Sequence, residues 1–333
     1  MLHALLLVVA LAPAADATAP CTTTSAGCTE WIALGSSGSR SLVYRTYPLD
    51  AKSERITRAV IVIHGAGRDA DNYFRTAVAA AFLAGGLEDS LVISPRFASK
   101  DGSGCRDELA ANEVSWSCGG DSWRSGGVAS SDPRLTSYDF MDELLKKIAR
   151  KSVFPNLKAI VVSGHSAGGQ FVTRYQMANQ VHDTLGVPVS YIVSNPSSYA
   201  YLDPERPREG TSELRPFGDA RNCTSYDRWP YGLQNRTGYA AKLSDAQLKA
   251  QLAARRVTYL LGELDILPLG GFDSSCPAMA QGPTRLARGQ AFAAYVNQKY
   301  SAGHQVLVVP LCGHNARCMF TAEKALPLLF PKP

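Results

Sequence analysis

Short apolar runs recur along the chain and alternate with longer amphipathic stretches. Residues 59–63 read Ala-Val-Ile-Val-Ile, a continuous run that is typical of a strand buried on both faces of a parallel sheet. Residues 41–47 also predict a strand, because their side chains alternate in character. Further runs that predict strands lie at residues 91–93, 159–162, 191–193, 257–261 and 306–309.

Helical periodicity occurs between these runs. Residues 136–139 read Thr-Ser-Tyr-Asp, which predicts a helix start, and apolar residues then repeat at four-residue spacing up to Ile148. Residues 286–300 predict a second helix, with Phe292, Tyr295 and Val296 on one side. Strands that alternate with helices indicate an α/β fold with a doubly wound, mostly parallel sheet.

Two long stretches interrupt this alternation, at residues 94–131 and 195–245. Loops of this length usually have a function, so we expect insertions that form a cap over the site. Their aromatic side chains suit either substrate contact or a small core of their own. The candidate substrate contacts are Tyr73, Trp116, Trp123, Tyr199 and Trp229.

The first residues predict a signal peptide. Residues 4–12 form an apolar run, and Ala15-Asp16-Ala17 matches the small-x-small pattern before a cleavage site, although the segment lacks Lys and Arg. The run is shorter than the about 20 apolar residues of a membrane span. We expect residues 1–17 to be removed, residues 18–333 to form one domain without a transmembrane segment, and the protein to be secreted or periplasmic.

All eight cysteines lie beyond residue 17, and an even number in an exported chain suggests disulfides. Their connectivity is open, because the sequence allows many pairings. A zinc site is the alternative, but no Cys-x-x-Cys pair exists and the six histidines are scattered, so we expect no metal. Pairing neighbours closes the shortest loops and gives Cys21–Cys28, Cys105–Cys118, Cys223–Cys276 and Cys312–Cys318.

The charge pattern argues against a nucleic-acid partner. The formal net charge is +5, without an extended block of Lys and Arg. Such a mild excess indicates a solvated basic surface. Charged residues make up 19% of the chain and apolar residues 45%, which is an ordinary globular balance.

The strongest chemical signal is Gly164-His165-Ser166-Ala167-Gly168, directly after a predicted strand and before an apolar helix. This is the Gly-x-Ser-x-Gly nucleophile elbow in the strand–turn–helix context that it requires. The two glycines allow backbone segments to approach closely, and the helix N-terminus favours developing negative charge. Ser166 is therefore the predicted nucleophile.

A serine hydroxyl needs a neighbouring base, and an elbow of this kind is followed along the chain by an acid and then a histidine. Three histidines follow Ser166. His182 lies in or just after the next helix, and His304 precedes a strand, at the wrong end of a parallel sheet. His314 follows that strand, at the edge where ligands bind, and is the predicted base.

The acid should follow the preceding strand, residues 257–261. Asp265 is favoured over Glu263 because two more residues carry it past the turn, and Asp273 in a Gly-rich loop is a further alternative.

An oxyanion hole needs two preorganised N–H donors. One is predicted at Ala167, after the nucleophile. The other should come from the loop after residues 59–63, which reads His64-Gly65-Ala66-Gly67. Ala66 is preferred and Gly65 is second, while His64 is expected to shape the loop by hydrogen bonding.

With these motifs in place, residues 59–330 resemble the α/β-hydrolase superfamily at the elbow, the acid, the histidine and the oxyanion loop. Within it the chain is similar to secreted single-domain esterases of the feruloyl-esterase and polyhydroxyalkanoate-depolymerase groups, through the short His-Gly-x loop, the secretion signal and the cysteines. The loop departs from the His-Gly-Gly-Gly pattern of another esterase branch, which argues against that branch.

The residues and the resemblance together imply a serine hydrolase that cleaves carboxylic esters through an acyl-enzyme intermediate. No metal or organic cofactor is required. We expect a monomer. Its expected partner is a small-molecule or polymeric ester substrate. A serine peptidase or amidase is the alternative, because these residues do not distinguish esters from amides, and a non-catalytic binding protein is less favoured because every part is intact.

Overall fold

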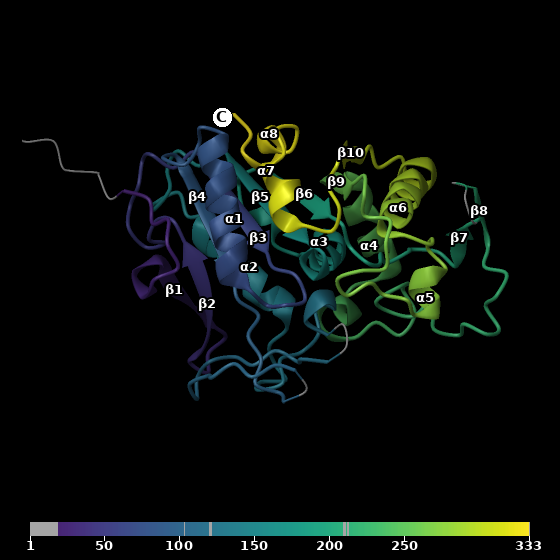
Figure 1. Ribbon diagram of the computed structural model, residues 1–333. Helices are drawn as coiled ribbons and strands as arrows, with labels where there is room; N and C mark the ends of the chain where they lie inside the picture. The colour runs from purple at the N-terminus through teal and green to yellow at the C-terminus, as the bar shows by residue number, and fades with distance from the viewer. Residues whose placement is uncertain (1–18, 103, 120–121, 209–210, 212, 333) are drawn as a thin grey trace, which may run out of the picture.

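The computed structural model describes residues 19–102, 104–119, 122–208, 211 and 213–332 (Figure 1). The predicted signal peptide lies outside the described residues. Within these ranges, no helix combines the length and the apolar character that a membrane crossing requires.

An eight-stranded sheet forms the centre of the structure (Figure 1). Its order is β1-β2-β4-β3-β5-β6-β9-β10; the strands from β4 to β10 are parallel, and β1 and β2 are antiparallel at one edge. The doubly wound, mostly parallel prediction is therefore confirmed. The strands of this sheet are β1 Thr29–Leu34, β2 Ser39–Arg45, β3 Arg58–Ile63, β4 Ser90–Pro95, β5 Ala159–His165, β6 Val189–Ser194, β9 Arg256–Gly262 and β10 Gln305–Val309.

Helices cover both faces of the sheet. Successive residues of a strand point to opposite faces, so Ile61 packs in the core with α2, α3, α4 and α6, while Val60 packs in the core with α1, α7 and α8. The helices are α1 Ala70–Leu83, α2 Ser137–Ile148, α3 Ala167–Ala178, α4 Asp245–Ala254, α5 Cys276–Met279, α6 Arg285–Tyr300, α7 Ala316–Thr321 and α8 Leu326–Leu329.

The predicted apolar runs all lie in strands of this sheet, and the run at residues 41–47 corresponds to β2. Strand β1 was not expected from the sequence. Its side chains Ile32 and Leu34 are buried, but Trp31 is exposed on the edge, where the Arg40 guanidinium lies 4.1 Å from its ring centre. An exposed tryptophan among apolar neighbours hides the alternation that would have predicted this strand.

The predicted helix starts are confirmed. At the start of α2 the Thr136 hydroxyl accepts from the backbone N–H of Asp139, and the Asp139 carboxylate accepts from the backbone N–H of Thr136. This reciprocal arrangement is a capping box. Helix α6 begins at Arg285, one residue before the expected start.

The two long insertions contain little regular structure and contact each other. The first holds the 3₁₀ turn η2 (Trp123–Ser125), and the second holds the hairpin β7–β8 (Glu205–Pro207 and Leu214–Pro216) and the 3₁₀ turn η4 (Gly238–Lys242). The Trp229 indole donates to the Ser125 carbonyl at 3.1 Å, and Tyr239 N–H donates to the Gly126 carbonyl at 2.9 Å. The insertions therefore support one another beside the sheet.

Candidate active site

The turn between β5 and α3 holds Ser166 in a strained backbone conformation. Its φ is 59° and its ψ is −118°, a region that residues other than glycine rarely adopt. The turn packs tightly, because a Cβ on Gly168 would lie 2.2 Å from the Ile63 carbonyl oxygen and one on Gly164 would lie 2.4 Å from the Gly168 oxygen. Only glycine fits at these two positions, as the elbow motif requires.

Ser166, His314 and Asp265 form one chain of hydrogen bonds. The Ser166 Oγ lies 2.9 Å from His314 Nε2, and His314 Nδ1 lies 2.8 Å from Asp265 Oδ2. Since the ionised carboxylate only accepts, Nδ1 carries the proton and Nε2 accepts from the hydroxyl. The side chain of Asp265 is 1% exposed and that of His314 is 12% exposed, so the chain of bonds runs from the interior to the partly exposed Ser166.

The alternative acids and bases have other partners. The Glu263 carboxylate accepts from the backbone N–H of Leu311, and the Asp273 carboxylate accepts from the Tyr231 hydroxyl. His182 bonds the Tyr191 hydroxyl at 2.8 Å. His304 is buried between the Tyr259 hydroxyl and the Leu252 carbonyl.

The loops after β9 and β10 are fastened to each other, which brings Asp265 and His314 together. Leu264 N–H donates to the Cys312 carbonyl at 2.9 Å. The Asn195 side chain bridges both loops, because its amide nitrogen donates to the Gly313 carbonyl and its oxygen accepts from Gly262 N–H.

Four disulfides are present, and they join the pairs that close the shortest loops. Cys312–Cys318 spans the loop that carries His314 and reaches into α7. The other three are Cys21–Cys28, Cys105–Cys118 and Cys223–Cys276.

His64 fixes the first peptide of the predicted oxyanion loop. Its Nδ1 donates to the Gly65 carbonyl at 2.8 Å, and its Nε2 accepts from Phe97 N–H at 3.1 Å. Burial lowers the pKa of His64 from 6.5 to about 4, so the ring is neutral and keeps one donor and one acceptor. Because a trans peptide points its C=O and its N–H in opposite directions, holding the Gly65 carbonyl also orients Ala66 N–H.

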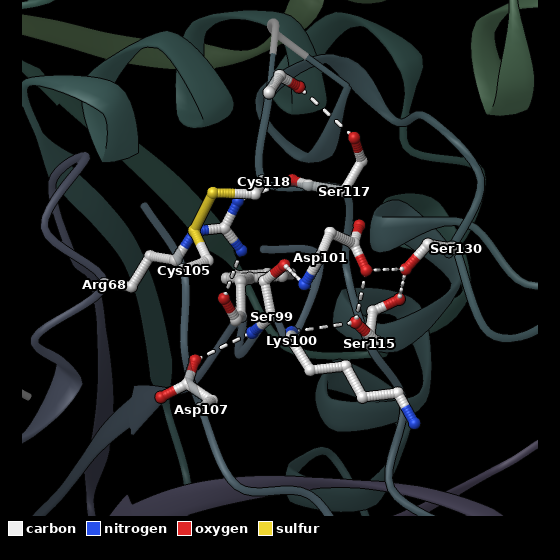
Figure 2. The surroundings of a disulfide bond; sticks show 12 residues. Arg68, Ser99, Lys100, Asp101, Cys105, Asp107, Ser115, Ser117, Cys118 and Ser130 are labelled. Atoms are coloured by element: carbon white, nitrogen blue, oxygen red, sulfur yellow. Dashed lines mark hydrogen bonds between the residues drawn. A yellow bond between two sulfur atoms is a disulfide. The ribbon is translucent and has the colours of Figure 1, made fainter. Parts of the chain in front are cut away.

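Arg68 anchors the other end of this loop. Its guanidinium donates to the Phe97 carbonyl at 2.6 Å and to the Ser117 carbonyl at 2.5 Å. Figure 2 shows Arg68 beside the disulfide between Cys105 and Cys118, which closes the segment that supplies the Ser117 carbonyl. The first insertion thus supports the loop next to Ser166.

Two further side chains, those of Tyr73 and His165, lie close to Ser166. The Tyr73 hydroxyl is 3.2 Å from His165 Nδ1, and a Cβ on Gly65 would lie 2.9 Å from the same hydroxyl. The His165 ring centre is 4.6 Å from that of His314. Burial lowers the pKa of His165 well below its usual value, so the ring beside His314 is uncharged.

Most of the predicted aromatic contacts belong to the core. Trp116 and Tyr199 are 0% exposed and Trp123 is 3% exposed, so these three side chains have almost no surface for a substrate. The expectation of substrate contact is wrong for them because all three are buried in the core, where Trp116 packs against α2, Trp123 against α3 and Tyr199 against α6. Tyr73 is also largely buried, near the predicted oxyanion loop, and Trp229 is half-buried between the insertions.

Arg285 was not expected at this site from the sequence, yet its side chain contacts the buried carboxylate of Asp265. Its Nη1 lies 3.3 Å from Asp265 Oδ1. A signal was present, since Arg285 and Arg288 precede Phe292 at helical spacing and therefore lie on the buried face of α6.

A parallel sheet with a hydrogen-bonded Ser–His–Asp chain beyond the ends of its strands defines a hydrolase of α/β fold. The model of the alpha/beta hydrolase family matches residues 60–326, and the chain belongs to this family.

Solved structures that share the fold include two hydrolases. The LpqC poly(3-hydroxybutyrate) depolymerase from Bordetella parapertussis matches with a TM-score of 0.61 and 23% identity, over 88% of this chain and 84% of that one. Poly(aspartic acid) hydrolase-1 from Sphingomonas sp. KT-1 matches with a TM-score of 0.63 and 23% identity, over 91% of this chain and 98% of that one. No curated protein sequence matches the chain.

Replacing His64 should change how stability depends on pH. His64→Asn keeps a donor near Gly65 but removes the titrating ring. In the wild type, His64 is protonated near pH 6.5 in the unfolded chain but only near pH 4 in the folded protein. As the pH falls from 6.5 to 4, this difference lowers the free energy of unfolding by about 3 kcal/mol.

The wild type should therefore exceed His64→Asn in free energy of unfolding by less at pH 4 than at pH 7. Urea unfolding of both proteins at each pH would measure this difference. A gap that stays constant across the window would mean that His64 is not held neutral.

The disulfide between Cys312 and Cys318 should matter more for catalysis than for stability. A loop this short contributes about 2 kcal/mol through chain entropy, while its local effect is to hold the His314 backbone. The double variant Cys312→Ser/Cys318→Ser should lower kcat by about tenfold or more, because a misplaced base slows proton transfer.

The matched control is Cys21→Ser/Cys28→Ser, which opens a similar loop beside the opposite edge of the sheet. It should lower Tm by a similar amount with kcat within twofold of wild type, by the same reasoning on loop length. Equal kcat losses in both double variants would show that the bridge acts on stability alone.

Proposed function

We propose that this protein is a serine hydrolase that cleaves carboxylic esters through a covalent acyl-enzyme. The observation that carries the proposal is the unbroken chain of hydrogen bonds from Ser166 through His314 to buried Asp265. His314 takes the proton from Ser166 as Oγ attacks the ester carbonyl, and Asp265 holds the imidazole and stabilises its cation. His314 then gives the proton to the leaving alcohol, and water releases the acyl group by the reverse path. These steps need no metal or cofactor.

The oxyanion of the tetrahedral intermediate is assigned to the backbone N–H groups of Ala167 and Ala66. Ala167 is the first residue of α3, so its N–H has no partner within the helix and lies at the positive end of the helix dipole. The loop from His64 to Gly67 is adjacent, because a Cβ on Gly65 would lie 3.6 Å from Ser166 Cβ. The Gly65 backbone is hydrogen-bonded to the Tyr73 hydroxyl. Because Gly65 N–H is occupied in this way, Ala66 is favoured over Gly65 as the second donor.

Exposed apolar side chains next to His314 support a substrate with an apolar part. A Cβ on Gly270, at the end of this surface, would lie 3.1 Å from the His314 ring. Large exposed apolar side chains that gather in one place are typical of binding surfaces, and most of those near His314 fall within residues 264–269. We name this surface the apolar rim, and its residues, each 48% to 80% exposed, are Leu264, Ile266, Leu267, Leu269 and Leu311.

The relatives leave the scissile bond open. One structural neighbour is named for poly(3-hydroxybutyrate), a polyester, and the other for poly(aspartic acid), a polyamide. An amidase or peptidase is therefore the second candidate. The apolar rim favours the ester, because its exposed leucines suit the apolar acyl or alcohol part of such a substrate.

The four disulfides support a location outside the cytoplasm, where such bonds persist. We assign the protein to a secreted or periplasmic compartment, with residues 1–17 as its export signal.

Ser166→Ala should keep the fold and lower kcat on p-nitrophenyl butyrate by on the order of 10⁵, because the nucleophile is lost while the pocket remains. Wild type should react with a fluorophosphonate probe at Ser166, and the variant should not. Turnover in Ser166→Ala within tenfold of wild type would refute the assignment. A wild type that cleaves peptide p-nitroanilides faster than p-nitrophenyl esters would favour the amidase.

The apolar rim should contribute to the binding of long acyl chains. Leu267→Ser/Leu269→Ser should raise KM for p-nitrophenyl octanoate by about tenfold, because each exposed leucine buries part of its surface against the chain, and should leave the acetate within about twofold. The control is Phe82→Ser/Leu83→Ser, which changes two residues of similar exposure at the end of α1. Equal KM values for all three proteins with the octanoate would show that the rim does not contact the acyl group.

A further inference from the structure

Arg285 joins three segments behind the proposed catalytic acid. It is the first residue of α6, and its side chain is 0% exposed. Its Nη1 lies 3.3 Å from Asp265 Oδ1, its Nε donates to the Ser197 hydroxyl at 2.8 Å, and its Nη2 donates to the Gly270 carbonyl at 2.9 Å. A planar guanidinium suits this task, because it offers several donors in a fixed arrangement.

The two oxygens of the Asp265 carboxylate have different partners. Oδ2 accepts from His314, and Oδ1 faces Arg285. Because each oxygen is held separately, the carboxylate cannot rotate without losing a charged contact. Both the carboxylate and the guanidinium are buried, so if one is removed, water cannot easily take its place as partner of the other.

We propose that Arg285 is a positioning residue for the reaction: it orients the Asp265 carboxylate toward His314 and offsets part of its negative charge. This inference rests on the proposed function of Ser166, His314 and Asp265. Arg285 has no contact with the nucleophile, so it acts through the acid.

The offset of charge has a consequence for the pH profile. A cation behind Asp265 weakens the attraction of that carboxylate for a protonated imidazole. The groups that face His314 are Asp265 and Ser166, with the His165 ring tilted beside it, and Glu263 on the adjacent loop is bonded to Leu311 N–H. Arg285 is thus a cation on the far side of Asp265 from His314. Its removal should let His314 stay protonated to higher pH.

Arg288 provides a matched control on the same helix. It is also 0% exposed and lies on the same Phe272 ring. Its partners are the carbonyl oxygens of Ser197, Asp273 and Gly282 and the sulfur of Met279, and Asp265 is not among them. Loss of Arg288 therefore removes a buried guanidinium without touching the acid.

The experiment measures kcat, KM and the pH dependence of kcat/KM for p-nitrophenyl butyrate with wild type, Arg285→Met, Arg285→Lys and Arg288→Met, with Tm for each. Arg285→Met should lower kcat by on the order of 10²-fold with KM little changed, because the base is misoriented. The midpoint of its acid limb should move up by about half a unit to one unit. Arg285→Lys, which keeps the charge without the planar fork, should keep the wild-type midpoint with an intermediate kcat.

Arg288→Met should lower Tm as much as Arg285→Met but retain the wild-type midpoint and a kcat within about threefold, because it leaves the acid in place. The inference is overturned if Arg285→Met and Arg288→Met have the same kcat and midpoint, or if Arg285→Lys shifts the midpoint as Arg285→Met does. If Arg285→Met does not fold, Arg285→Lys still decides between these results. A wild type that fails to react with the fluorophosphonate at Ser166 would instead refute the proposed function.

Discussion

The close approach of helix α3 to strand β3 is the constraint on which the rest of the site depends. A Cβ at Gly168 would lie 2.2 Å from the Ile63 oxygen, so the helix reaches this distance only with glycine. Ser166, two residues before Gly168, has a positive φ and lies beside the loop that begins at His64. Strain of this kind persists only where the surroundings determine it. The remaining parts are then loops that have to reach a fixed serine.

Local pattern predicted most of this arrangement. The sheet, the elbow, His314 and Asp265 follow from apolar runs and from the order of residues along the chain, because parallel strands bring their carboxyl ends to one edge. The burial of Trp116 could not be predicted in that way. It depends on how the insertions pack against α2, which no periodicity encodes. The same holds for Arg285, whose partner lies 20 residues away.

Buried polar groups, rather than regular elements, attach the second insertion to the sheet layers. The Asp142 carboxylate on α2 accepts from the Tyr175 and Tyr239 hydroxyls, and Tyr239 belongs to the insertion. Burial raises the pKa of Asp142 to about 6, which shows that these two bonds only partly compensate for lost hydration. The Arg174 guanidinium on α3 makes a similar attachment to the Pro230 carbonyl. Such groups specify a unique position for a segment that has little secondary structure, because any other position would leave them unsatisfied.

His314 differs from its partners in how it is held. Ser166 is fixed by the elbow and Asp265 by burial, whereas the His314 side chain is partly exposed and sits on a short loop. That loop is fastened at both ends, by the disulfide from Cys312 to Cys318 and by Asn195, which also holds the end of β9. In the proposed reaction the base exchanges protons with solvent and substrate, so it cannot be buried as Asp265 is. Its geometry therefore has to come from restraints on the backbone, and these are the restraints that surround it.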